Sequence, residues 1–450
     1  MTDVSGNFTL NAKKGDILVV SFVGYNTQEL TVDGSTTPIV VVLTEASSLK
    51  EVVITGYSSQ VKRNITGAVG TISNKDLLAV PSTGVAQALQ GRIAGVSVGQ
   101  EGGPGGGTMV RIRGFGTVGD NEPLYIIDGV PTQTGLNDIN PNDIETVQVL
   151  KDASAASIYG ARAGNGVVIV TTKRGKAGKA KLTFDAYTGT QVVPTLPGVL
   201  SAQQFADVLW AAQKNNGQNP SHPKFGNGAT PSVPTALNAE GTVLTNKNGT
   251  NWLDEIFNNA PTKNFNIGVT GGSDAGSYAF SGGYMKQDGI LLHTGYERFT
   301  GRVNTNFNIN KNVRIGENLS VSYSTKVGIS NQNTENPVTM AIRMPSVLPV
   351  YRTDGVTYAG GGVGGFNNAQ NPVWALTRAK DNYDTRLRVF GNAFMEVDLM
   401  KGLTAKTSIG IDYLGGQINK FTGINYEDAE VVGSNKLEQT ANTVAGYTWF

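Results

Sequence analysis

The sequence contains no cysteine and only two histidines, His222 and His293, which lie far apart along the chain. Without thiols there is neither a disulfide framework nor a thiolate metal site. Two isolated imidazoles also do not make a zinc site or a histidine-based acid–base pair. Lysine and arginine (36) balance aspartate and glutamate (35), which argues against the broad basic face that nucleic-acid binding needs. We therefore expect no metal, no cofactor and no nucleic-acid partner.

Long apolar segments are missing as well. No stretch approaches the ~18 uninterrupted apolar residues of a transmembrane helix, so any crossing of a membrane would need a closed barrel of strands. The N-terminus has no basic region followed by an apolar run, which is the pattern of a signal peptide. For an exported protein we interpret this gap as a truncated beginning.

Glycine is the residue in excess, at 58 of 450 residues, against a usual share of ~7%. The glycines follow no collagen period, and proline is limited to 17 residues, so a structureless low-complexity chain is not indicated. Many glycines among alternating strands favour tight turns in a loop-rich β protein.

The pattern of predicted strands, helices and linkers divides the chain into four parts. Residues 1–45 predict short strands, among them Ile39–Leu43, which hold too little core for a whole domain and indicate part of a small β-sandwich. Residues 46–56 form a linker with an isolated β-prone stretch. Residues 57–175 mix short helices and strands. From residue 180 to residue 450 the pattern changes to long alternating strands.

The long strands carry apolar residues on one face and polar or charged residues on the other. Their turns alternate between short ones and two long loops, at about residues 194–262 and 328–384. Strands of ~10 residues with this alternation are typical of an outer-membrane barrel. A soluble β-sandwich has the same period of two and remains the alternative. The strands with this pattern are 180–188, 298–309, 313–324 and 387–399.

Two motifs that suggest chemistry lack the context they need. The glycine-rich run Glu101–Thr108 is followed by a strand and has no Gly-Lys-Ser/Thr, so it is not a phosphate loop. Gly95–Gly99 matches the nucleophile-elbow letters, but a helix precedes it and strand-spaced valines flank Ser97. No acid, base, nucleophile or metal set completes an active site, and we predict that the protein is not an enzyme.

Two groups of side chains have a structural and a binding interpretation. Charged residues in the middle region either bind ligand or line a domain packed inside a polar lumen, and we favour the second. Aromatic residues in the long loops either form a carbohydrate platform, or pack within the loops or form a girdle at the membrane interface, and we favour the structural role. The first group is Arg111, Arg113, Asp128, Lys151, Asp152 and Arg162, and the second is Trp210, Trp252, Trp374, Tyr351, Tyr358 and Phe366.

Several motifs resemble, in the same order, the SusC/RagA-type TonB-linked outer-membrane transporters. Leu49–Tyr57 is similar to the family's TonB-box segment, and residues 1–45 resemble the back half of its carboxypeptidase-regulatory-like domain. The plug motifs are Ala88–Val96, Val110–Gly114, Pro123–Pro131, Ile139–Glu145 and Val149–Gly160. About seven or eight strands follow, whereas plugged transporters of this type have ~22, so we expect the barrel to be incomplete.

The resemblance implies a mainly β protein: a partial carboxypeptidase-regulatory-like domain (1–45), a linker with a TonB box (46–56), a plug (57–175) and part of a barrel (180–450). It implies TonB-dependent import of an oligosaccharide or a peptide through the outer membrane, with a SusD-like lipoprotein as partner. A siderophore-type receptor and a non-transporting surface binder remain the alternatives. TonB would pair with an exposed strand, and the residues expected to do so are Glu51, Val52, Val53, Ile54 and Thr55.

Overall fold

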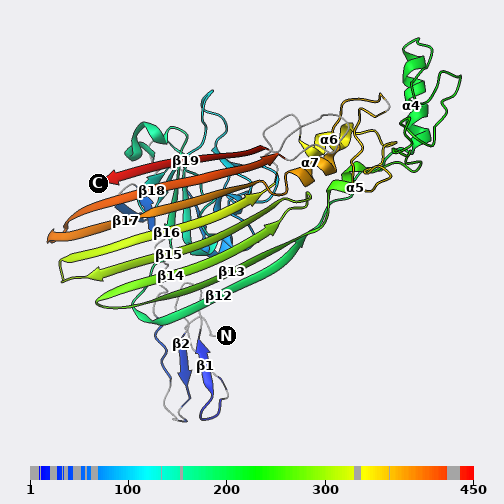
Figure 1. The fold of residues 1–450 in the computed structure, drawn as a ribbon. Coiled ribbons are helices and arrows are strands. Elements are labelled where there is room, and N and C mark those ends of the chain that lie inside the picture. Colours follow the sequence, from blue (N-terminus) through cyan, green and yellow to red (C-terminus); the bar gives the residue numbers. More distant parts are fainter. Residues whose placement is uncertain are drawn as a thin grey trace.

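A curved sheet of long strands is the largest element of the structure, which is a computed structural model (Figure 1). A smaller α/β unit, the plug, lies against one face of this sheet, and helices α4 to α7 lie beyond one end of its strands. The structure describes residues 10, 12–20, 28–32, 34, 39–43, 52–55, 58–61, 69–132, 134–152, 156–328, 336–363, 365–422 and 436–449.

The N-terminal part forms two separate hairpins. Strand β1 (Ile17–Val20) pairs antiparallel with β2 (Gln28–Thr31), and β3 (Val52–Thr55) pairs antiparallel with β4 (Ser58–Val61). The TonB-box residues from Val52 to Thr55 are therefore in a strand, while Glu51 lies outside the described residues. The strand expected over Ile39–Leu43 is wrong, because this stretch is irregular and pairs with no strand in the described part of the chain.

The plug is built on a five-stranded sheet with the order β5-β10-β11-β8-β9. Among the described strands, only β8 and β11 pair in parallel, and β5 is an edge strand that pairs with β10 alone. All four residues of β8 are buried, as expected for a sheet covered on both faces. The five strands are β5 (Val69–Ser73), β8 (Leu124–Ile127), β9 (Val130–Thr132), β10 (Ile144–Leu150) and β11 (Val167–Thr172).

Short elements cover the two faces of the plug sheet. One apolar cluster joins the sheet to α2 and the β6–β7 hairpin, and a second joins it to Ala156 and Ala163. The mixture of short helices and strands expected between residues 57 and 175 is present in the described part of this region. The covering elements are α1 (Asn74–Leu77), α2 (Val85–Ala88), β6 (Val96–Gln100), β7 (Thr108–Ile112), η2 (Pro141–Asp143) and η3 (Ser157–Ala163).

Eight antiparallel strands in sequence order form the large sheet, which we call the wall. Their lengths run from 13 to 20 residues, so the prediction of long strands is confirmed, and with it the mainly β fold class. Strands β12 and β19 lie at its two edges. The wall strands are β12 (Gly178–Gln191), β13 (Ala260–Ser273), β14 (Gly276–Asp288), β15 (Gly295–Asn308), β16 (Val313–Val327), β17 (Tyr383–Met400), β18 (Leu403–Thr422) and β19 (Lys436–Trp449).

The wall buries its polar face and exposes its apolar face. On β15, Arg298 and Asn304 are 3% and 0% exposed, whereas Phe299 and Phe307 are each 49% exposed. This is the reverse of a soluble β-sandwich, where the apolar face is covered. The polar face is the one against which the plug packs. The observed faces support the barrel interpretation over the soluble sandwich.

The two long loops, β12–β13 and β16–β17, pack together into a unit with its own apolar core. Ser201 starts α4 with a capping box, in which its hydroxyl accepts from Gln204 N at 3.3 Å and Gln204 Oε1 accepts from Ser201 N at 2.9 Å. The four helices are α4 (Ala202–Asn215), α5 (Trp252–Ile256), α6 (Pro337–Arg343) and α7 (Pro372–Arg378).

The aromatic residues of these loops serve mainly as packing. Trp210, Trp252 and Trp374 are 2%, 2% and 3% exposed. The indole N–H of Trp210 donates to Gly228 O, and that of Trp252 donates to Pro345 O, each at 3.0 Å. Loop packing therefore accounts for the three tryptophans, and a carbohydrate platform built on them is excluded because their faces are covered.

No helix in the described part of the chain is both long enough and apolar enough to cross a membrane.

Candidate functional site

The plug contacts the wall mainly through the segment that joins β9 to β10, for which residues 134–143 are described. This segment is rich in amides and carboxylates, and it faces arginines on the polar side of β15 and β17. Because both surfaces leave water on contact, each charge needs a partner to offset its loss of hydration. The following contacts show how that requirement is met.

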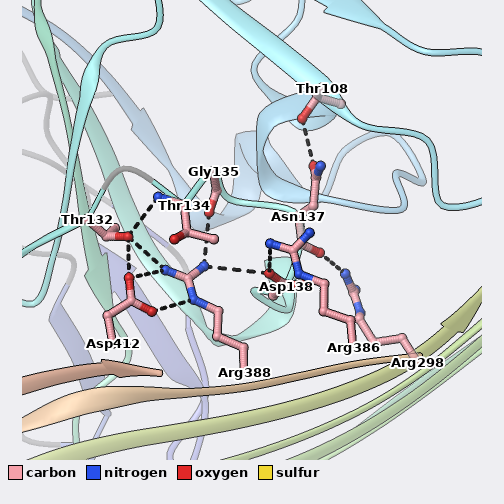
Figure 2. Close-up of polar contacts among 10 residues, drawn as sticks. All are labelled: Thr108, Thr132, Thr134, Gly135, Asn137, Asp138, Arg298, Arg386, Arg388 and Asp412. Atoms are coloured by element: carbon pink, nitrogen blue, oxygen red, sulfur yellow. Dashed lines mark hydrogen bonds and ion pairs between the residues drawn. The ribbon is translucent and has the colours of Figure 1, made fainter. Parts of the chain in front are cut away.

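Arg388 of β17 is the most completely bound of the wall arginines (Figure 2). Its Nε and Nη2 donate to the two carboxylate oxygens of Asp412 on β18, at 3.0 and 3.1 Å. Its Nη1 donates to Gly135 O at 3.1 Å, and its Nη2 also donates to Thr132 Oγ1 at 3.0 Å. The residue is 2% exposed. This guanidinium joins two wall strands to the plug.

The Thr132 hydroxyl completes the same cluster. It donates to Asp412 Oδ2 at 2.5 Å and accepts from Thr134 N at 3.0 Å. Asp412 thus accepts from one plug residue and one wall residue. A buried ion pair with every hydrogen-bonding group used is stable as a unit, but the loss of one member leaves an uncompensated charge.

Arg386, two residues before Arg388, is held less tightly. Its Nη2 lies 3.2 Å from Asp138 Oδ2. Asp138 is 5% exposed, while the Arg386 side chain is 42% exposed. Asp138 is also 3.7 Å from Arg388, so both arginines neutralise one plug carboxylate. The neighbouring plug residue Asn137 accepts from Thr108 Oγ1 at 2.7 Å (Figure 2).

Two arginines on β15 fix the plug backbone. Arg298 donates to Asn137 O, and Arg302 donates to Lys173 O at 2.6 Å and to Thr172 Oγ1. Thr172 Oγ1 in turn donates to Asp128 Oδ2 at 2.5 Å. Asp128 therefore connects to the wall through one intervening hydroxyl.

Asn140 and Asp143 are also buried in the contact, at 5% and 6% exposed. Asn140 Nδ2 donates to Asn266 Oδ1 at 2.6 Å and to Thr300 Oγ1 at 3.3 Å. Burial raises the pKa of the Asp143 carboxyl, and the charges of Arg302, Lys173 and Arg298 oppose this rise. The wall arginines thus hold a neighbouring carboxylate as well as the plug backbone.

Apolar contact supplements the polar one. Phe390 of β17 is 6% exposed and belongs to the same core cluster as Tyr125 and Val130 of the plug. A Cβ on Gly410 of β18 would lie 3.1 Å from both methyls of Val130, so the wall approaches the plug closely there. The plug core extends in this way onto the wall, and the two units share part of one core.

Comparisons with known proteins point to one family. Residues 61–167 match the family described as TonB-dependent Receptor Plug Domain. The chain is 34% identical, over 98% of its length, to TonB-dependent receptor P26 of Formosa agariphila. It is 37% identical, over 65% of its length, to TonB-dependent receptor SusC of Bacteroides thetaiotaomicron. A solved structure of the RagAB peptide importer in its open-open state matches 89% of the chain with a TM-score of 0.70 and 27% identity.

This chain belongs to the SusC/RagA-type TonB-dependent receptors. It spans 43% of the length of P26, 28% of SusC and 46% of the RagAB chain that it matches.

The six plug residues predicted to face a lumen have different surroundings in this SusC/RagA-type receptor. Asp128 reaches the wall through Thr172, as described above. Arg113 pairs with Asp152 at 2.6 Å, and Lys151 donates to Ala94 O at 2.7 Å, so these contacts lie inside the plug. Arg111 lies over the Phe115 ring at 4.3 Å from its centroid, and Arg162 is exposed in η3. A lumen-facing role for these residues stays a prediction.

The residues that join plug and wall include several that the sequence interpretation did not select. Asn137, Asp138 and Asn140 lie in or beside a quoted plug motif, and Arg298, Arg302 and Arg388 were recognised only as members of polar strand faces. Arginines repeated on a buried polar face require acceptors on the surface that covers them. The acceptor-rich stretch 137–143 was the signal available for the partner side.

The motifs rejected on sequence grounds are also not chemical sites in the structure. Ser97 lies within β6, which forms a hairpin with β7, instead of on a strand-to-helix turn. The glycine-rich run leads into β7 and not into a helix. Among the described residues there is no group of three or more histidine, aspartate or glutamate side chains arranged to hold a metal ion.

We expect that Gly105→Ala destabilises the receptor more than Gly103→Ala. Both glycines have positive φ, 58° and 95°, which costs other residues about 1–2 kcal/mol. A Cβ on Gly105 would lie 2.1 Å from the Tyr296 ring of β15, whereas one on Gly103 would meet nothing within 4 Å. Thermal unfolding of the complete protein in detergent measures the difference, and Tyr296→Ala should reduce it. Equal shifts for the two variants would contradict this packing.

Proposed function

We propose that this receptor imports a nutrient, an oligosaccharide or a peptide, across the outer membrane with energy supplied by TonB. The observation that carries the proposal is the inverted wall, whose apolar face is exposed while its polar face binds the plug. In a bilayer, an exposed apolar face such as that of Phe299 and Phe307 suits contact with lipid. The plug on the opposite face would then close the lumen of the barrel.

The proposal assigns TonB capture to Glu51, Val52, Val53, Ile54 and Thr55. Strand addition uses main-chain N–H and C=O groups of an exposed edge, so it needs a strand that is not paired on both sides. Within the described part of the chain, β3 pairs only with β4 and has one open edge. This edge supports a role in capture by an inner-membrane partner.

The remaining assignments follow from the same architecture. The unit formed by α4 to α7 would lie on the outer side, where a SusD-like lipoprotein would meet it. The plug residues Arg111, Arg113, Lys151, Asp152 and Arg162 would face the lumen, and Asp128 would join the plug to its wall. The protein would act by binding and movement alone, without enzymatic catalysis.

Uptake of the nutrient is expected to fall to background when TonB is absent, while binding at the cell surface remains. Cells that carry the complete protein, with and without TonB, are compared for accumulation and for surface binding of radiolabelled nutrient. Uptake that persists without TonB would favour a passive channel. Binding without uptake in both strains would favour a surface binder, and competition by ferric chelates would favour a siderophore receptor.

A further inference from the structure

A pocket of ≈ 240 Å³ lies between the plug and the wall. The plug contributes Glu101, Glu122, Asn137 and Asp138 to its lining, and β17 contributes Arg386. These residues come from three separate plug segments and one wall strand. The pocket is therefore created by the docking of plug on wall.

The pocket lies toward the end of the wall that carries the long loops. Arg386 follows shortly after Tyr383, where β17 emerges from the β16–β17 loop. The neighbouring plug run packs Gly105 against Tyr296, close to the start of β15 at that same end. Under the proposed function, this is the side from which a nutrient arrives.

Arg386 differs from the other arginines that bind the plug. Arg298, Arg302 and Arg388 are 3%, 6% and 2% exposed, and the plug uses their donors. The Arg386 side chain is 42% exposed, and among the described plug residues it forms an ion pair with Asp138 alone. Its buried Nε has no hydrogen-bond acceptor among the described residues. A guanidinium has five N–H donors, so Arg386 retains donors for a ligand.

Two carboxylates on the plug side of the pocket, those of Glu101 and Glu122, form no ion pair with any described residue. Glu101 Oε2 accepts from Gly107 N at 3.4 Å, and Glu122 Oε2 accepts from the Tyr125 hydroxyl at 3.4 Å. Burial raises the pKa of Glu122 and the nearby charge of Asp120 adds to the rise, while the Tyr125 hydrogen bond and the charge of Arg111 oppose it. An incoming positive group would relieve this excess of negative charge.

We propose that this pocket binds a peptide substrate, with the ammonium terminus at Glu101 and Glu122 and the terminal carboxylate at Arg386. The proposal rests on the import function above and specifies its substrate class. Groups of both signs in one pocket match a zwitterion, whereas a polyanion would be repelled by the glutamates. None of the described residues that line the pocket is aromatic, so it lacks the stacking face that favours a sugar ring.

The test measures binding by calorimetry to the complete protein in detergent, without TonB. The probes are tetraalanine with free termini, its N-acetylated form, its C-amidated form and the neutral sugar maltotetraose. We expect each capped peptide to bind the native protein at least about 10-fold more weakly than free tetraalanine, because each cap removes one charge-assisted hydrogen bond.

The variants assign each terminus to its side chain. Glu101→Gln with Glu122→Gln should weaken free tetraalanine about 10-fold or more and leave the N-acetylated form unchanged. Arg386→Gln should weaken the free peptide and leave the C-amidated form unchanged. The glutamate variants do not disturb the wall contact, so they remain informative if Arg386→Gln loosens the plug. Asp274→Asn, in the β13–β14 turn at the opposite end, is the matched control and should bind normally.

Three results would overturn the proposal: no binding of free tetraalanine, equal loss for free and capped peptides, or maltotetraose binding that depends on Arg386. Failure of the import function would be seen separately. In that case peptide would bind through these residues, but no TonB-dependent uptake would follow. Conversely, TonB-dependent uptake that is insensitive to the pocket variants would reject the pocket and leave import intact.

Discussion

Val53→Pro is expected to reduce uptake to background while surface binding of the nutrient stays intact. Proline removes the main-chain N–H and cannot occupy a ladder position that needs it. Val53 lies within β3 and is paired with Gln60 of β4. If TonB adds its own strand to β3, the loss of one donor in this short segment breaks the ladder on which the affinity depends. Uptake and whole-cell binding of radiolabelled nutrient are measured for the same cells.

Two further variants separate capture from other effects. Val53→Ala keeps the main-chain donor and should be milder than proline. Gln60→Pro disturbs the same hairpin from its other strand, so uptake should largely survive if β3 alone is captured. Normal import by Val53→Pro cells would show that this segment does not couple energy, and a passive channel or an adhesin would then explain the protein better.

Arg388→Met is expected to destabilise the docked plug by about 3–5 kcal/mol, the usual effect of removing one partner from a buried ion pair. Methionine preserves much of the side-chain length but leaves Asp412 without its two charge-assisted hydrogen bonds. It also leaves Gly135 O and Thr132 with fewer partners. Unfolding in guanidinium, followed by limited proteolysis of the plug, would detect the loss.

Arg314→Gln supplies the matched control. Arg314 also binds wall carboxylates, with Nη1 to Asp398 Oδ2 at 2.7 Å, but it is more exposed and has no contact with the plug among the described residues. Its replacement should change stability only slightly. Adding Asp412→Leu to Arg388→Met should recover part of the loss, because it removes the uncompensated charge. Equal effects of Arg388→Met and Arg314→Gln would contradict the role of Arg388 in holding the plug.

The wall was the most predictable part of the fold, because a period of two over many residues leaves few alternatives. The pattern over 298–309 and 313–324 corresponds to β15 and β16 within a few residues. The irregular Ile39–Leu43 shows the opposite case, since a short β-prone stretch becomes a strand only where another strand pairs with it. In the plug, β5 was not predicted, because its sequence VGTIS combines β-branched residues with a glycine.

The candidate site was only half predictable for a similar reason. Alternation placed Arg298, Arg302 and Arg388 on a polar face, but it did not identify what they bind. Gly135 O and Arg388 are separated by 253 positions in sequence. Such a pairing depends on how two finished units dock, and no local pattern encodes it. The pocket that contains Arg386 and Asp138 forms only when the plug docks on the wall, so the sequence did not predict this pocket either.

The order of elements along the chain determines how a mechanical load would travel through the plug. A tension applied at Val53 passes through β4 and then reaches β5, which is an edge strand of the plug sheet and is paired among the described strands with β10. The arginine contacts lie later in the chain, from Thr132 to Lys173. A moderate force would therefore separate β5 from the plug sheet first. The part of the plug from Thr132 to Lys173, which is bound to wall strands between β13 and β18, would stay in place. The receptor would then open by partial unfolding of the N-terminal part of the plug, while the rest of the plug stays bound to the wall.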